Sequence, residues 1–195
     1  MSRVSERVSE PASDPLPPAV PSAPPVPLVA VVMGVSGTGK STLGTALARD
    51  LGWPYAEGDD FHSAANVAKM RAGHPLTDED RWPWLRAIAA WIGEREQAGS
   101  GGVVTCSALR RSYRDLLRAG HPDVRFICLA GSRDVLATRL AGRQGHFMPP
   151  SLLDSQLATF EPLGPDEPGG EVDIQGTPAQ TELAARRLLD VAEPR

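Results

Sequence analysis

The chain has 195 residues and a formal net charge of −4 at pH 7, and 23% of its residues are charged. This length suits one α/β domain with a full hydrophobic core, and the acidic balance gives no indication of nucleic acid or an anionic membrane as a partner. Because no apolar run approaches the ~18 residues that a membrane-spanning helix needs, we expect no membrane segment.

The first 27 residues differ in composition from the rest of the chain. They contain eight prolines together with serine, valine and alanine, and they lack the apolar stretch of a signal peptide. We therefore predict a disordered tail over 1–27 and a single folded domain over 28–195.

The first folded stretch is an apolar run over 28–33, followed by a glycine-rich loop and a helix with apolar residues on one face over 42–49. The loop fits the pattern G-x-x-x-x-G-K-S in full. Its glycines allow successive N–H groups to point at phosphate oxygens, and the helix N-terminus adds partial positive charge. Lys40 can reach the β- and γ-phosphates, and the Ser41 hydroxyl can ligate Mg²⁺. We therefore predict a nucleoside-triphosphate site formed by Gly34, Val35, Ser36, Gly37, Thr38, Gly39, Lys40, Ser41 and Thr42.

A short second strand is predicted over 53–57, and acidic residues follow it. In an open parallel sheet, ligands bind beyond the carboxyl ends of the strands, so Asp59 would lie beside the phosphate loop. There it could accept a proton or orient Mg²⁺. The alternative is that Asp59 or Asp60 caps the next helix. We favour Asp59 for chemistry and Asp60 for a local role.

A helix is predicted over 63–71, where His62, Asn66 and Lys69 or Met70 recur at steps of three and four residues and so share a face. Such a polar face is either simply solvated or, following the candidate carboxylate directly, turned toward a substrate.

A polar loop is predicted over 73–81, and Pro83 is expected in the first turn of the following helix. The apolar stripe of that helix, Trp84, Ile88, Trp91 and Ile92, belongs to the core. Asp80 and Arg81, which precede it, either supply a cap and a surface charge or hold substrate.

The third strand is predicted over 103–106, and no aspartate stands at its end, where a nucleotide-hydrolysing motor or switch usually places a Mg²⁺ ligand. A helix over 108–117 follows, with Arg110, Arg111 and Arg114 near its start. Because basic residues there oppose the helix macrodipole, they indicate a bound anion. Arg114 could instead pair with Asp115 or with a neighbouring helix.

The fourth strand is predicted over 123–130, and Ser132 is expected to cap the helix that carries Arg139. The loop over 142–150, which is rich in arginine, glycine and histidine, has the place and composition of a kinase lid. Arg139 and Arg143 are then candidates to neutralise charge on the transferring phosphoryl group, unless they are surface residues of a solvated helix end.

The remaining elements are a helix over 152–160, a loop over 162–170, a short strand over 172–174 and a final helix over 177–189. The alternation of strands and helices predicts a doubly wound α/β fold, in which a parallel sheet has helices on both faces. Cys106 and Cys128 both lie in apolar runs, so we expect buried thiols and a reducing, cytoplasmic compartment.

With these motifs in order, the chain resembles the gluconate kinases, a family of P-loop small-molecule kinases. The phosphate loop is the first motif of the resemblance. The second comprises Gly58-Asp59-Asp60-Phe61-His62, Asn66, Lys69-Met70, Asp80-Arg81 and Pro83-Trp84-Leu85. The third is Cys106-Ser107-Ala108-Leu109 with Tyr113-Arg114-Asp115, and the fourth is Gly145-His146-Phe147 with Ser155-Gln156. The family often has a lysine after Ala108-Leu109, where this chain has Arg110-Arg111.

The resemblance implies a three-layer fold with a five-stranded parallel sheet and a short lid. It also implies a homodimer that uses ATP and Mg²⁺ to phosphorylate D-gluconate at the 6-hydroxyl. A sugar acid needs a cation for its carboxylate and short polar side chains for its hydroxyls. The expected catalytic residues are Lys40, Asp59, Arg139 and Arg143. The expected substrate-binding residues are Asp59, His62, Asn66, Lys69, Arg81, Arg110, Arg111, Arg114, His146 and Gln156.

Two other functions share part of this pattern. Shikimate, adenylylsulfate and nucleoside monophosphate kinases share the loop and the sheet, but a shikimate kinase would carry Asp-x-Asp after the second strand and a glycine triplet after the third. A non-enzymatic nucleotide switch could use the D-x-x-G sequence at 166–169. It would also need an Asn-Lys-x-Asp motif to read the base, and Asn66 is the only asparagine in the chain.

Overall fold

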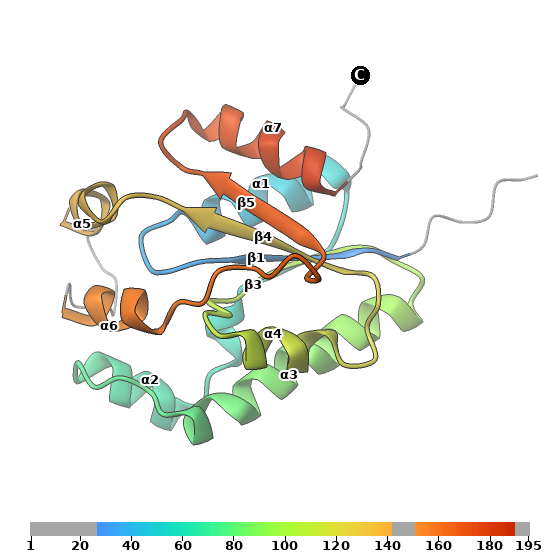
Figure 1. Ribbon diagram of the computed structural model, residues 1–195. Coiled ribbons are helices and arrows are strands. Elements are labelled where there is room, and N and C mark those ends of the chain that lie inside the picture. The colour runs from blue at the N-terminus through green and yellow to red at the C-terminus, as the bar shows by residue number, and fades with distance from the viewer. Residues whose placement is uncertain (1–26, 142–150, 190–195) are drawn as a thin grey trace, which may run out of the picture.

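The computed structural model describes residues 27–141 and 151–189 as three layers around one parallel sheet (Figure 1). The strands are β1 (Val29–Met33), β2 (Tyr55–Ala56), β3 (Gly102–Thr105), β4 (Val124–Ala130) and β5 (Gly169–Asp173). Their order in the sheet is β2-β3-β1-β4-β5, and every pairing is parallel. The predicted five-stranded α/β fold is therefore confirmed.

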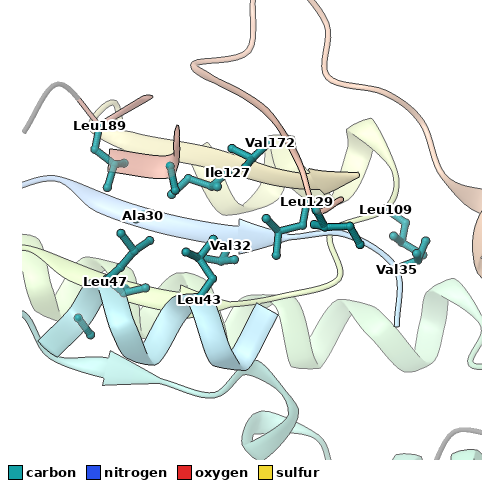
Figure 2. Packing of buried hydrophobic residues seen from close by; sticks show 14 of the residues in the cluster. Ala30, Val32, Val35, Leu43, Leu47, Leu109, Ile127, Leu129, Val172 and Leu189 are labelled. Atoms are coloured by element: carbon teal, nitrogen blue, oxygen red, sulfur yellow. The ribbon is translucent and has the colours of Figure 1, made fainter. Parts of the chain in front are cut away.

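The central strand β1 shows why its sequence is uniformly apolar. All five of its residues are fully buried, because helices cover the sheet on both faces. Successive side chains point to opposite faces, so Ala30 and Val32 pack against Leu43 and Leu47 of helix α1 (Lys40–Leu51), as Figure 2 shows. The side chains of Val29, Val31 and Met33 pack in the cluster on the other face.

The helices divide between the two faces of the sheet and the carboxyl end of its strands. Figure 1 shows α1 and α7 (Pro178–Leu188) on one side, and α3 (Asp78–Gln97) and α4 (Arg111–Arg118) on the other. The helices α2 (Ala64–Arg71), α5 (Arg133–Ala141) and α6 (Ser151–Thr159) lie near the end of the sheet toward which the strands run. The carboxyl ends of the strands and these three short helices therefore lie on the same side of the molecule.

One predicted boundary is wrong by several residues. Helix α3 begins at Asp78, inside the segment predicted as loop, and Pro83 lies within the helix and not in its first turn. Thr77 and Asp80 form a capping box, in which each side chain accepts a hydrogen bond from the other residue's backbone N–H. The stabilisation from this cap outweighs the loss of the backbone hydrogen bond that Pro83 cannot donate. The Pro83 side chain is exposed.

Other differences are smaller. Helix α4 begins at Arg111 and not at Ala108, whose φ of 42° is left-handed, and β5 begins at Gly169 and not at residue 172. Cys106 and Cys128 are free and buried, as predicted. Among the helices in the described residues, none combines the length and apolar character that crossing a membrane requires.

Candidate active site

A pocket of about 620 Å³ lies where the chain leaves β1, β2 and β3. The phosphate loop, residues after β2, and Ser107 after β3 line one side of it, and residues of α2, α3 and α6 line the other. In a doubly wound sheet this edge is where ligands bind. The sequence-predicted residues that line the pocket are Ser36, Gly37, Gly39, Lys40, Ser41, Asp59, His62, Arg81 and Gln156.

The phosphate loop is held in the shape that binds an anion. Gly34 has a φ of 134°, and a Cβ there would lie 2.6 Å from the Leu129 carbonyl oxygen, so only glycine fits. Lys40 folds back over the loop, and its Nζ donates hydrogen bonds to the carbonyl oxygens of Gly34 (3.1 Å) and Val35 (3.2 Å). The loop ends at the N-terminus of α1, where the helix dipole favours negative charge.

Gln156 of α6 contacts the phosphate loop directly. Its side-chain Oε1 accepts a hydrogen bond of 2.7 Å from the backbone N–H of Ser36. A loop amide of this kind is the donor that a phosphate oxygen would use, so Gln156 lies at the phosphate end of the pocket. Its expected contact with substrate remains a prediction.

Glu57, which the sequence analysis did not select, lies beside Lys40 and Ser41. Its carboxylate accepts hydrogen bonds from the hydroxyls of Tyr55 (2.7 Å) and Thr105. Burial raises the pKa of Glu57, but hydrogen bonds from Ser41, Thr105 and Tyr55, together with the charge of Lys40, lower it below the ordinary value. Glu57 is therefore ionised at neutral pH.

The residue after Glu57 locks this segment against the sheet. Gly58 donates its N–H to the Thr105 hydroxyl (2.9 Å) and accepts a hydrogen bond from the Trp84 indole (2.6 Å). A Cβ on Gly58 would lie 1.9 Å from the Thr105 carbonyl oxygen, so the close approach requires glycine. The short 3₁₀ helix η1 (Gly58–Phe61) begins here and presents Asp59 to the pocket.

Asp59 and Asp60 are both exposed and both line the pocket. The alternative that one of them caps helix α2 is wrong, because Ser63 is the N-cap and accepts a 3.2 Å hydrogen bond from the N–H of Asn66. The ring of His62 stacks on Trp84 with centroids 4.3 Å apart. Burial lowers the pKa of His62, while the charge of Asp59 raises it and that of Arg81 lowers it.

Two residues expected to bind substrate connect α2 to the start of α3. Asn66 is buried, and its amide donates to the Asp80 carbonyl oxygen (2.8 Å). Lys69 pairs with the Asp80 carboxylate. Neither residue is among those that line the pocket, and the substrate-binding role of Asn66 and Lys69 stays a prediction.

The three arginines expected to hold an anion are also engaged elsewhere, and none lines the pocket. Arg110 pairs with Asp78 (2.8 Å), and Arg111 pairs with Asp115 and Asp166. Arg114 is fully buried and forms a two-pronged ion pair with Glu167. Carboxylates of the protein compensate these charges in this structure, and the role of Arg110, Arg111 and Arg114 as substrate ligands stays a prediction.

A second pocket of about 400 Å³ lies on the other side of the phosphate loop. Arg139 lines it and donates to the carbonyl oxygens of Thr38 (3.4 Å) and Ile174 (2.7 Å). Leu43, Leu129 and Pro178 give this pocket apolar walls. Arg139 thus joins α5 to the loop's outer side and does not line the first pocket, while Arg143 and His146 lie outside the described residues.

Comparisons with known proteins agree with this geometry. The family model of an AAA domain matches residues 29–163. A gluconokinase from Gluconobacter oxydans is 56% identical over 142 residues, which are 73% of this chain and 80% of the relative. An unliganded crystal structure of a sugar kinase from Janibacter superposes with a TM-score of 0.81 at 51% identity, covering 85% of this chain and 96% of the other. A gluconokinase from Sinorhizobium meliloti has a TM-score of 0.76 at 47% identity, covering 84% and 92% of the two chains.

Proposed function

The chain belongs to the gluconokinase family, and on this premise we propose that it transfers the γ-phosphoryl group of ATP to the 6-hydroxyl of D-gluconate. The observation that carries the proposal is one pocket in which a complete phosphate loop faces a carboxylate and an arginine. The loop suits the phosphates of ATP, and the polar and charged lining suits an acidic polyol. Shikimate, adenylylsulfate and nucleotide kinases share the fold, and the identity to gluconokinases favours D-gluconate over their acceptors.

The phosphate end of the pocket supplies electrostatic stabilisation. Amide groups of the loop and the N-terminus of α1 would bind the β-phosphate of ATP, and Lys40 would add a full positive charge beside it. The apolar walls of the second pocket support it as the place of the nucleobase, on the far side of the same loop. ATP would then span the loop with its γ-phosphate in the first pocket.

The residues beside Lys40 fit a Mg²⁺ ion. Mg²⁺ is bound in kinases by one or two protein oxygens, substrate phosphates and water, so a cage of several carboxylates is not required. Within the described residues no cluster of three or more acidic, histidine or cysteine side chains occurs, but Ser41 and the ionised Glu57 stand together. We propose that these two hold the ion, which when bound neutralises charge on the β- and γ-oxygens.

At the acceptor end, Asp59 is the group proposed to accept the proton of the attacking hydroxyl. It lines the same pocket as Lys40 and Ser41 and is exposed to it. A carboxylate within hydrogen-bond reach of the hydroxyl both orients the oxygen for in-line attack and takes its proton. Arg143 and His146 keep their predicted roles in charge neutralisation and substrate binding.

A panel of acceptors tests the proposed function. Purified protein with ATP and Mg²⁺ is supplied in turn with D-gluconate, shikimate, adenylyl sulfate and nucleoside monophosphates, and ADP release is followed by a coupled assay. We expect turnover with D-gluconate alone, and its loss in Lys40→Ala with the fold retained by circular dichroism. Turnover that is slow and indifferent to every acceptor would contradict the proposal.

We further propose a cytoplasmic location, which the two free, buried thiols of Cys106 and Cys128 support. Burial raises the pKa of both thiols to about 12, which keeps them protonated and unreactive. The homodimer implied by the family resemblance stays a prediction.

A further inference from the structure

We infer that the Ser107 hydroxyl contacts the acceptor oxygen that attacks the γ-phosphorus and, together with Asp59, fixes its direction of attack. Ser107 belongs to the third motif of the family resemblance, in which it has no assigned role. The inference rests on the proposed function, because it concerns the same acceptor hydroxyl. It adds a second protein group at that oxygen, beside the base already proposed.

The first argument is the place of Ser107 between the proposed base and the phosphate loop. Strand β3 lies between β1 and β2 in the sheet, so residues after its end lie between the loop that follows β1 and the acid that follows β2. The Ser107 carbonyl oxygen accepts a 3.3 Å hydrogen bond from the N–H of Gly34, the first residue of the loop. On the other side, a Cβ on Gly58 would lie 3.4 Å from the Cα of Cys106. Asp59 and Ser107 each follow one of these two contacting residues, and both line the first pocket.

The second argument is that the backbone after Ser107 is held in a strained conformation. Ala108 has a φ of 42°, and among the residues that the structure describes it is the one non-glycine residue in the left-handed region. Such a conformation persists only where surrounding contacts enforce it, and it is typical of functional sites. Here the buried Arg114 guanidinium donates to the carbonyl oxygens of Ala108 (3.2 Å) and Leu109 (3.4 Å). The Glu161 N–H also donates to the Leu109 carbonyl oxygen (2.8 Å), so the scaffold maintains this turn from two directions.

The third argument is the geometry of a tetrahedral oxygen. A hydroxyl oxygen has four directions: its bond to carbon, its O–H bond and two lone pairs. Asp59 fixes only the O–H direction. When Ser107 donates a hydrogen bond to one lone pair, the other is directed at the γ-phosphorus. During transfer that lone pair forms the new P–O bond, the bond from phosphorus to ADP breaks, the proton passes to Asp59, and Ser107 keeps its own proton.

The test uses two ligands that differ only in the reacting oxygen. D-Gluconate carries the 6-hydroxyl, and 6-deoxy-D-gluconate lacks it but keeps every other group. For the wild type and Ser107→Ala, kcat and KM are measured with D-gluconate, and calorimetry gives the Kd values for ATP and for 6-deoxy-D-gluconate. Ser112→Ala is the matched control, because Ser112 is exposed on α4 and lies outside both pockets. The same kcat comparison in an Asp59→Asn background measures the coupling between the two residues.

We expect Ser107→Ala to lower kcat about 5- to 30-fold, the effect of losing one orienting hydrogen bond, while Tm and the Kd for ATP stay unchanged. The Kd for 6-deoxy-D-gluconate should change less than about twofold, because the oxygen that Ser107 contacts is absent from this ligand. In the Asp59→Asn background the same substitution should lower kcat less than about threefold, since the attacking oxygen is already misdirected. Ser112→Ala should match the wild type in every measurement.

Any of four results would overturn the inference. An unchanged kcat in Ser107→Ala would remove the contact, and weaker binding of 6-deoxy-D-gluconate would assign it to another part of the acceptor. Full additivity with Asp59→Asn would show that the two residues act on different atoms, and a lower Tm with weaker ATP binding would show that Ser107 only supports the loop. Each differs from a failure of the proposed function, in which the wild type shows no turnover of D-gluconate at all.

Discussion

Replacing Glu167 with glutamine should destabilise the protein strongly, although the residue lies outside both pockets. The Arg114 guanidinium donates from Nε to Oε1 of Glu167 (2.6 Å) and from Nη2 to Oε2 (2.9 Å), and the Gly164 N–H also donates to Oε2 (2.8 Å). The side chains of Arg114 and Glu167 are 0% and 1% exposed, so water cannot solvate the guanidinium when the carboxylate charge is removed. The variant therefore leaves a buried guanidinium without its counter-ion.

The magnitude follows from what remains around Arg114. Breaking one partner of a buried ion pair costs about 3–5 kcal/mol in general. Here Arg114 keeps hydrogen bonds to four backbone carbonyl oxygens, those of Ala108, Leu109, Glu161 and Pro162. These oxygens satisfy its N–H groups but not its charge, so we place the loss near the lower limit, about 3 kcal/mol. For a chain of this size that loss lowers Tm by roughly 6–12 °C.

Urea unfolding followed by circular dichroism measures this loss. Asp166→Asn is the control, because its ion pair with Arg111 is exposed and should contribute little to stability. Burial raises the pKa of Glu167, but hydrogen bonds from Arg114 and Gly164 outweigh this effect, so the pKa lies below the ordinary value. A lowered folded-state pKa stabilises above the unfolded value, about 4.3, and that contribution disappears as pH falls through the folded value. The gap between wild type and Glu167→Gln should therefore narrow in acid, and a loss below 1 kcal/mol at neutral pH would refute the reasoning.

Two predictions concern the acids at the carboxyl end of β2. Asp59→Asn should lower kcat by ~10²–10⁴, because a general base contributes only part of the acceleration, while ATP affinity and thermal stability stay nearly unchanged. If steady-state kinetics show the same loss for Asp60→Asn, Asp59 is not the general base. Glu57→Gln should weaken Mn²⁺ binding to the ADP complex, measured by electron paramagnetic resonance, by about 10- to 100-fold, while metal-free ADP affinity changes less than about threefold. Equal loss with and without metal would instead assign Glu57 to the architecture of the loop.

The parts of the fold that the sequence predicts well are those that local pattern determines. The continuous apolar run of β1, the loop with Lys40 and Ser41, and the capped helix α7 each have their signals within a dozen residues. A strand buried on both faces needs apolar residues throughout, and a phosphate loop needs its glycines at fixed steps. No information from distant segments is required.

Partners that lie far apart in the chain cannot be predicted from the sequence. A sequence shows that Arg114 is charged, but not that Glu167, 53 residues later, meets it in the core. The same holds for Asn66 and Lys69. Their partner Asp80 lies in the first turn of α3, a helix that begins earlier than the sequence predicts. A polar residue in a conspicuous motif can therefore serve the scaffold, and only its partners distinguish the two roles.

The acid that the sequence analysis missed shows the same point in reverse. At the end of β3, where a Mg²⁺ carboxylate would be expected, the chain has Thr105. In the fold, β2 pairs with β3, and the Thr105 hydroxyl contacts the two residues that follow β2. It donates a hydrogen bond to the Glu57 carboxylate and accepts one from the Gly58 N–H. The third strand thus orients an acid supplied by the second. Because β2 ends at Ala56 and the chain then turns into η1, Glu57 and Asp59 both line the pocket. An acid-x-acid spacing directly after a short second strand is the signal that could have identified both.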